Sequence, residues 1–194
     1  MDKDIVLKKI CKNFGEKHIL NNYSMTYKAN SFNVFTGKSG CGKTTLLKII
    51  MGIEPIDSGE ILGIEDKKIS VVFQENRLCE NLTAYRNVKL VCEYMTDDEI
   101  KKAFERVGLL EDMYTVVKNL SGGMKRRVAI LRGILHECDI LFLDEPFKEL
   151  DYQTFEDVRN FVFEKSSNKT VICVSHNKNI LELGNVTVHN IENT

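Results

Sequence analysis

A glycine-rich loop reads Gly37-Lys38-Ser39-Gly40-Cys41-Gly42-Lys43-Thr44 and joins an apolar run to a helical pattern. The apolar run, Phe32–Thr36, predicts a buried strand, and the pattern after the loop predicts a helix from about Lys43 to Met51. The loop fits the motif G-x-x-x-x-G-K-[ST] in the strand-to-helix context that this motif requires. A chance match is rare, because glycine makes up only about 7% of an average sequence. The loop therefore predicts a site for nucleotide phosphates.

The residue types in this loop indicate how it would bind phosphate. Glycines let backbone N–H groups curl around phosphate oxygens without a Cβ in the way, and the helix N-terminus adds its dipole. We expect Lys43 to neutralise the β- and γ-phosphates of a nucleotide, and the Thr44 hydroxyl to bind Mg²⁺. Thr45 follows directly in the sequence, and we count it among the nucleotide-binding residues.

Two adjacent carboxylates follow an apolar run later in the chain. Ile140–Leu143 predicts a buried strand, and Asp144, Glu145 and Pro146 come directly after it. In an open parallel sheet, ligands bind at the carboxyl ends of the strands, where Gly37 and Asp144 would both lie. We expect Asp144 to hold Mg²⁺ and Glu145 to act as the general base for the attacking water. A solvated turn is the alternative for both acids, and a purely electrostatic role is the alternative for Glu145.

Apolar strands alternate with helical patterns along the chain, which predicts an α/β fold with a mainly parallel sheet covered on both faces. Further strands are expected at residues 5–7, 69–73, 170–174 and 186–191. Helices are expected from the capping box of Thr96 and Glu99 to Gly108, from Ser121 to about 135, and over 154–164. We expect one domain, 1–194, with a nucleotide-binding core of 1–75 and 135–194 and an inserted helical subdomain of 76–134.

The composition excludes several classes of protein. Of 194 residues, 43% are hydrophobic and 28% are charged, which is typical of a folded globular chain. A formal net charge of -1 argues against a nucleic-acid partner. No apolar run approaches the roughly 20 residues that cross a bilayer, and no signal peptide begins the chain, so we expect a cytoplasmic protein. The six cysteines form no C-x-x-C pair, which argues against a zinc site.

A further motif, Leu120-Ser121-Gly122-Gly123-Met124, resembles the signature motif of ATP-binding cassette (ABC) ATPases. A flexible loop before a helix is the alternative for these residues alone. Other positions match the family in the family's order: an aromatic residue that stacks on adenine, a glutamine that reaches Mg²⁺, an aspartate in the loop that crosses the dimer interface, and a switch histidine at the γ-phosphate. These are Phe14, Gln74, Asp151 and His176. A core aromatic is the alternative for Phe14, and an ordinary surface histidine for His176.

The resemblance implies a P-loop NTPase core with an N-terminal antiparallel β part and an inserted α-helical subdomain. It also implies that the chain binds ATP and Mg²⁺, and that Glu145, His176 and Gln74 are its catalytic residues. ABC ATPases form head-to-tail dimers. In such a dimer, Ser121, Gly122 and Gly123 of one subunit would cap the nucleotide held by residues 37–45 of the other.

The resemblance further implies partners. We expect a second ATPase subunit, a transmembrane permease on a separate chain and, for an importer, an extracytoplasmic solute-binding protein. The chain would then lie on the inner face of the cell membrane. Met124 and Gln74–Leu78 look most similar to importers of the nitrate, sulfonate and taurine type, whereas Phe147–Leu150 departs from the small residues usual before Asp151. An exporter ATPase and a soluble assembly ATPase are the alternative functions.

Overall fold

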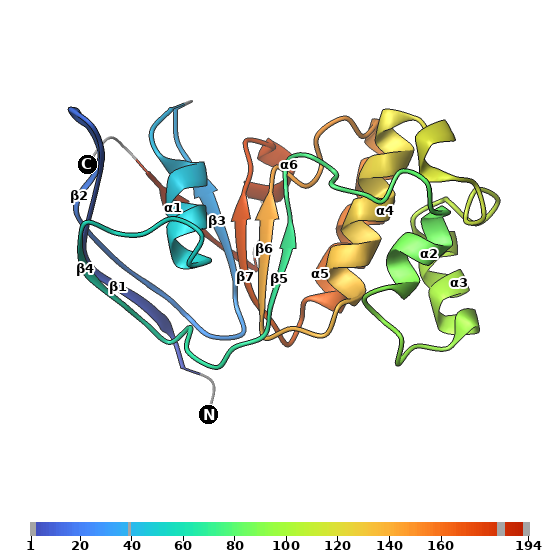
Figure 1. The fold of residues 1–194 in the computed structure, drawn as a ribbon, viewed down its shortest axis with the longest axis horizontal. Helices are drawn as coiled ribbons and strands as arrows, with labels where there is room; N and C mark the ends of the chain where they lie inside the picture. Colours follow the sequence, from blue (N-terminus) through green and yellow to red (C-terminus); the bar gives the residue numbers. More distant parts are fainter. Residues whose placement is uncertain (1–2, 39, 182–184, 192–194) are drawn as a thin grey trace.

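The computed structural model describes residues 3–38, 40–181 and 185–191. Within this part of the chain, a five-stranded parallel sheet occupies the middle of the molecule, in the order β5-β6-β7-β3-β8 (Figure 1). Its strands are β3 (Phe32–Thr36), β5 (Ile69–Val72), β6 (Ile140–Asp144), β7 (Thr170–Val174) and β8 (Val186–Asn190). The expectation of an α/β fold with a mainly parallel sheet is confirmed.

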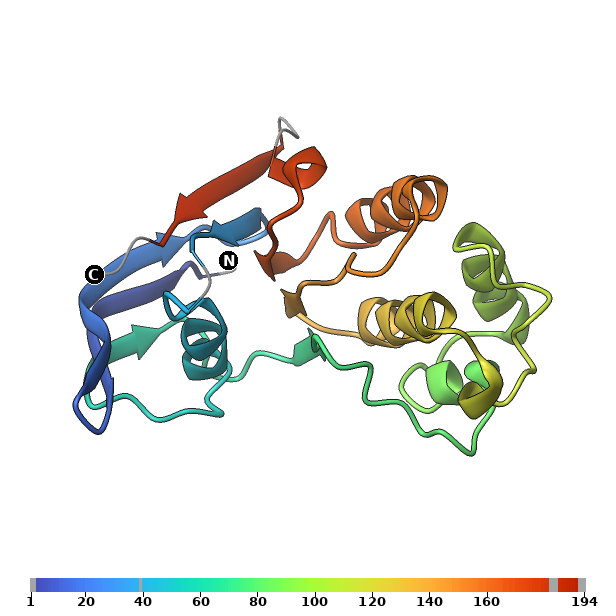
Figure 2. The same ribbon diagram turned by 90° about the horizontal axis from the view of Figure 1, so that it is seen from above.

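Both faces of the parallel sheet are covered, which explains the continuous apolar sequence of β6. Leu141 and Leu143 belong to the core on the side of the helical region, the helices of residues 84–135. Ile140 and Phe142 belong to the core on the opposite side. Figure 2 shows the central strands between these two layers. Because successive side chains of a strand point to opposite faces, a strand buried on both faces must be apolar at every position.

A separate antiparallel sheet contains β1 (Ile5–Phe14), β2 (Lys17–Tyr27) and β4 (Ser58–Leu62), in the order β2-β1-β4. The antiparallel β part that the resemblance implied is thus confirmed, although the residue pattern alone predicted only residues 5–7 of it as a strand. The pairing of β1 with β2 contains register shifts, and both Lys9 and Asn22 have positive φ. These irregularities break the strict alternation of apolar and polar residues that identifies a strand in a sequence.

The helices begin and end largely where the sequence placed their caps. They are α1 (Lys43–Ile50), α2 (Ala84–Lys89), α3 (Asp97–Arg106), α4 (Gly122–Leu135), α5 (Tyr152–Lys165) and α6 (Lys178–Leu181), with a 3₁₀ turn at Val117–Asn119. Both bonds of the capping box at Thr96 are present. Gly108 has a φ of +63° just beyond α3, as expected for a glycine that ends a helix. Helix α2 was not predicted.

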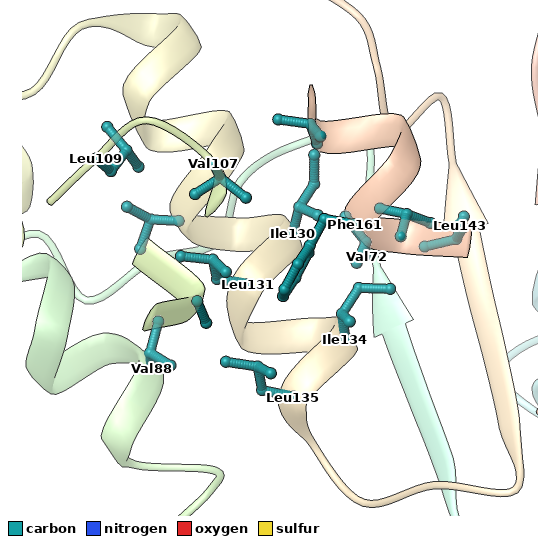
Figure 3. Packing of buried hydrophobic residues seen from close by; sticks show 14 of the residues in the cluster. Val72, Val88, Val107, Leu109, Ile130, Leu131, Ile134, Leu135, Leu143 and Phe161 are labelled. Carbon is teal, nitrogen blue, oxygen red and sulfur yellow. The ribbon is translucent and has the colours of Figure 1, made fainter. Parts of the chain in front are cut away.

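Helix α4 joins the helical region to the parallel sheet. Figure 3 shows Leu131 and Leu135 directed towards Val88, and Ile130 and Ile134 directed towards the side of Val72 and Phe161. All of these residues belong to one continuous hydrophobic core. The proposed division at residues 76–134 therefore stays a prediction, since this core crosses it. Among the described residues, no helix is long and apolar enough to cross a membrane.

Gly133 allows α4 to lie close to β5, and this contact supplies a test of the packing. A Cβ at Gly133 would overlap Cγ2 of Val72. Alanine normally stabilises a helix interior by about 1 kcal/mol relative to glycine, whereas overpacking a core costs about 1–3 kcal/mol. We therefore expect Gly133→Ala to lower the free energy of unfolding by about 1 kcal/mol in urea titrations.

Removal of the overlapping methyl group supplies the control. In a Val72→Ala background, the same Gly133→Ala change should cost less, because the methyl group that it meets is gone. A double-mutant cycle measures this coupling. A Gly133→Ala protein as stable as the original chain would contradict the close packing of α4 on β5.

Candidate functional site

The phosphate loop, residues 37–44, lies between β3 and α1. At two of its glycines, neighbouring atoms leave no room for a side chain. Gly37 has a φ of +147°, and a Cβ there would overlap the carbonyl oxygen of Ile191. Gly42 has a φ of +97°, and a Cβ there would lie 2.8 Å from Cγ2 of Ile19. A side chain at either position would therefore displace the loop. Ser39 lies outside the described residues.

Lys43 is the cation of this loop, and it is only 7% exposed. Its Nζ donates hydrogen bonds to the carbonyl oxygens of Gly37 and Lys38, each at 2.9 Å. The loop backbone thus holds the ammonium group of Lys43 next to the loop, where it could neutralise the charge of a bound phosphate. Cys41 lies 3.7 Å from Nζ through its Sγ and is buried in the core behind the loop.

A cleft of about 680 Å³ connects this loop to the carboxyl ends of β5, β6 and β7. Ten of the residues predicted from the sequence line it: Phe14, Gly40, Gly42, Lys43, Thr44, Thr45, Gln74, Asp144, Glu145 and His176. Phe14 is 49% exposed, which contradicts the alternative of a core aromatic. Gly37, Lys38 and Cys41 belong to the loop but do not line the cleft.

Both carboxylates at the end of β6 are shielded from solvent, Asp144 almost fully and Glu145 in part. Asp144 is 5% exposed, and burial raises the pKa of its carboxyl, although the Arg126 guanidinium acts in the opposite direction. Burial also raises the pKa of Glu145, again against an opposing effect from His176. The alternative of a solvated turn is therefore wrong for Asp144. Raised carboxyl pKa values in a cleft are typical of functional sites.

The backbone at Glu145 is unusual for a residue with a side chain. Its φ is +46°, and its N–H donates to the carbonyl oxygen of Val174 at 2.9 Å. This bond ties the end of β6 to the end of β7, two residues before His176. As a result, Nε2 of His176 lies 3.6 Å from Oε1 of Glu145. Positive φ at such a residue is a strained conformation that tends to occur at active sites.

The cleft also offers a set of oxygen ligands suited to Mg²⁺. Thr44 contributes a hydroxyl, Gln74 an amide oxygen and Asp144 a carboxylate, and all three line the same cleft. Mg²⁺ prefers oxygen ligands of these kinds, together with waters and substrate phosphates. A divalent cation would also stabilise the charged form of Asp144, which burial alone disfavours. These residues therefore fit the ion.

The signature residues lie elsewhere on the molecule. Ser121 is the N-cap of α4, and its hydroxyl oxygen accepts a hydrogen bond from the Met124 N–H at 3.3 Å. Asp151 is the N-cap of α5 and accepts from the Thr154 N–H at 3.1 Å. The side chain of Thr154, and then its backbone N–H, lower the pKa of the Asp151 carboxyl. None of Ser121, Gly122, Gly123 and Asp151 lines this chain's own cleft. Their predicted role in a partner's site stays a prediction.

Sequence reasoning missed four of the lining residues: Lys17, Ile19, Lys148 and Val174. The first two come from β2, which was not predicted as a strand. Val174 belongs to a strand that was predicted, and its place beside the carboxylates follows from the pairing of β6 with β7. The sequence analysis mentioned Lys148 only as part of a segment that departs from the ABC pattern. Among the residues that the structure describes, Lys148 forms no ion pair.

Solved structures with the same fold include a putative ABC transporter ATP-binding protein from Pyrococcus furiosus. It is 25% identical, with a TM-score of 0.84 over 97% of this chain and 98% of that chain. A bacterial Atm1-family ABC exporter with ATP bound has the same TM-score at 21% identity, over 98% of this chain and 37% of that chain. The second likeness bears on the fold alone.

Curated relatives are similar over most of this chain. The spermidine/putrescine import ATP-binding protein of Pasteurella multocida is 32% identical, and the match covers 90% of this chain and 52% of that protein. The sulfate/thiosulfate import ATP-binding protein of Mannheimia succiniciproducens is 34% identical, and the match covers 90% of this chain and 54% of that protein. The chain thus spans about half the length of these relatives. The likeness to nitrate, sulfonate and taurine importers stays a prediction.

The model of the family described as "ABC transporter" matches residues 20–148, which contain the phosphate loop, the signature motif and both carboxylates. This match covers more than half of the chain, and it agrees with the fold and with the composition of the cleft. The chain therefore belongs to the ABC transporter ATP-binding family.

Proposed function

We propose that this chain binds ATP with Mg²⁺, hydrolyses it, and drives the import of a solute through a membrane permease. One observation carries the proposal: a single cleft joins the phosphate loop to two buried or half-buried carboxylates, a glutamine and a histidine. The relatives named above are import ATP-binding proteins, which supports import over export.

The residues that line the cleft would have separate roles in binding and hydrolysis. Lys43 and the loop N–H groups would bind the phosphates, and Phe14 would stack on the adenine ring. Glu145 would accept the proton of the attacking water, and His176, 3.6 Å away, would orient that carboxylate and the γ-phosphate. Thr44, Gln74 and Asp144 would hold Mg²⁺, which supplies positive charge against the developing negative charge on the phosphate oxygens.

A second copy of the chain, or a related subunit, would complete each site. At the N-terminus of α4, the backbone N–H groups of Ser121, Gly122 and Gly123 have no acceptor within the helix. A helix N-terminus of this kind binds anions. These residues do not line their own cleft, so a phosphate that they contact would come from the other subunit. Asp151 would lie in the same interface. We infer a head-to-tail dimer on the inner face of the membrane, bound to a separate permease and served by an extracytoplasmic solute-binding protein.

Replacement of the proposed base tests the dimer and the chemistry together. General bases contribute about 10²- to 10⁴-fold to reaction rates, so we expect Glu145→Gln to lower kcat for ATP hydrolysis by at least about 100-fold. Nucleotide affinity should persist, because the phosphate loop is unchanged. The variant should then accumulate as an ATP-bound dimer in light scattering.

A matched control uses a carboxylate at the other end of the same strand. Glu137 is exposed and precedes β6, so Glu137→Gln should leave both kcat and the oligomeric state unchanged. Retention of hydrolysis by Glu145→Gln would remove Glu145 as the base. A monomer at saturating ATP, in the presence of the permease, would contradict the dimer.

The pH dependence of hydrolysis should report the burial of Glu145. A general base works only as the carboxylate, so the rate must fall as pH decreases through the pKa of Glu145. Burial raises this pKa above the ordinary glutamate value of about 4.3. We expect the acid limb of kcat to lie above that value, while affinity for a non-hydrolysable ATP analogue changes less over the same range. A rate that stays constant down to the ordinary glutamate pKa would contradict this role.

The partner is best identified from native membranes. We expect the tagged chain to recover a polytopic membrane protein after detergent solubilisation, and mass spectrometry would identify it. An untagged extract supplies the control for carry-over. Recovery of soluble partners only, from demonstrably intact membranes, would contradict the transporter and favour a soluble assembly ATPase.

A further inference from the structure

Arg126 is a buried cation in the first half of α4. Five of its six hydrogen-bond acceptors are backbone carbonyl oxygens, and the sixth is Oδ1 of Asn76. The residue is 2% exposed. Burial lowers the pKa of its guanidinium, and the carboxylates of Asp144, Glu149 and Glu145 oppose that effect. Burying a charge costs free energy unless its donors are paired. The partners of this guanidinium therefore indicate what it does.

The hydrogen bonds of Arg126 join two loops that are far apart in the sequence. On one side, Nη1 donates to the carbonyl oxygens of Phe73 and Gln74, the latter at 3.2 Å, at the end of β5. On the other side, Nη2 donates to the carbonyl oxygens of Asp144 and Glu145 at 3.0 and 2.8 Å. Nε donates to Pro146 O at 2.8 Å. One rigid, planar group thus spans the ends of β5 and β6.

Three of these five carbonyls belong to residues that line the nucleotide cleft. Gln74, Asp144 and Glu145 all contribute to it, and Glu145 has the strained φ of +46°. A strained backbone persists only where its surroundings fix it. Arg126 bonds the carbonyl oxygens of three consecutive residues, 144–146, and therefore restrains the turn that directs the Glu145 side chain.

We propose that Arg126 is a positioning residue that fixes the backbone of Gln74 and Glu145 relative to the signature helix α4. This role rests on the proposed catalytic function of those two residues. Arg126 follows Ser121 by five residues, which is about 7.5 Å along a helix axis. A displacement of the signature motif by the partner's nucleotide would therefore move the guanidinium and, through it, the catalytic groups of this chain's own cleft.

The neighbouring Arg127 offers a matched control. It lies on the same helix and also donates to backbone carbonyls, those of Val107 and Gly108 at 2.9 and 3.0 Å. Its remaining bond, from Nε, reaches Gly123 O. All of these acceptors lie within the helical region. The two arginines therefore share their chemistry but differ in the parts that they connect.

Lysine substitutions test the proposal while keeping the charge. A lysine at position 126 has one donor nitrogen, which cannot reach both strand ends as the guanidinium does. Because small displacements of catalytic groups cost up to about 100-fold in rate, we expect Arg126→Lys to lower kcat by about 10- to 100-fold. Affinity for a non-hydrolysable ATP analogue should stay unchanged. Arg127→Lys should keep the original kcat.

Hydrogen exchange supplies a second readout that needs no hydrolysis. In Arg126→Lys, amides of residues 73–76 and 144–149 should exchange faster, whereas those of α1 should not change. In Arg127→Lys, both cleft segments should keep their original exchange rates. Original kcat and exchange rates in Arg126→Lys would overturn the proposal. Equal losses in both variants, or lost analogue binding in Arg126→Lys, would also overturn it, because they indicate general destabilisation.

The same assay separates this proposal from the function on which it rests. If Glu145→Gln hydrolyses ATP like the original chain, the proposed base is wrong, whatever Arg126 does. If Glu145→Gln is inactive and Arg126→Lys is fully active with unchanged exchange, the catalytic proposal stands and the positioning role fails.

Discussion

The parallel pairing of β7 with both of its neighbours is the constraint on which the rest of the site depends. Cys173 pairs with Val34 of β3 on one side and with Leu143 of β6 on the other. This register places the loops after the three strands side by side. The phosphate loop, the carboxylates and His176 therefore all lie at the carboxyl ends of the strands. A slip of one residue would turn the apolar side chains of a strand to the wrong faces, so burial on both faces fixes the register.

Local signals in the sequence predicted the elements whose ends are capped or whose strands are fully buried. The apolar run before Asp144, the capping box at Thr96 and the cap at Ser121 all depend on neighbouring residues only. The hairpin of β1 and β2 was missed, because positive φ at Lys9 interrupts its pattern. Lys17 was therefore missed as a cleft residue.

The cleft itself was largely predictable, because the motif residues follow buried strands in a known order. The contacts of Arg126 were not predictable, since they join segments near residues 73, 126 and 145 that meet only in the folded chain. Two kinds of interaction thus hold α4 in place. Its apolar side chains fill space without a preferred direction, whereas the guanidinium bonds specify where the two loops lie.

The position of β3 within the sheet has a consequence for synthesis on the ribosome. β3 ends at Thr36, but its neighbours begin only at Thr170 and Val186, and the carbonyl of Ile191 packs on Gly37. The phosphate loop is therefore translated early, whereas the strands and the carbonyl group that pack beside it are translated late. Until then, both edges of an apolar strand lack partners, and such edges can pair wrongly with other chains. A nucleotide that binds only the folded site therefore cannot stabilise the chain before β7 and β8 have been made.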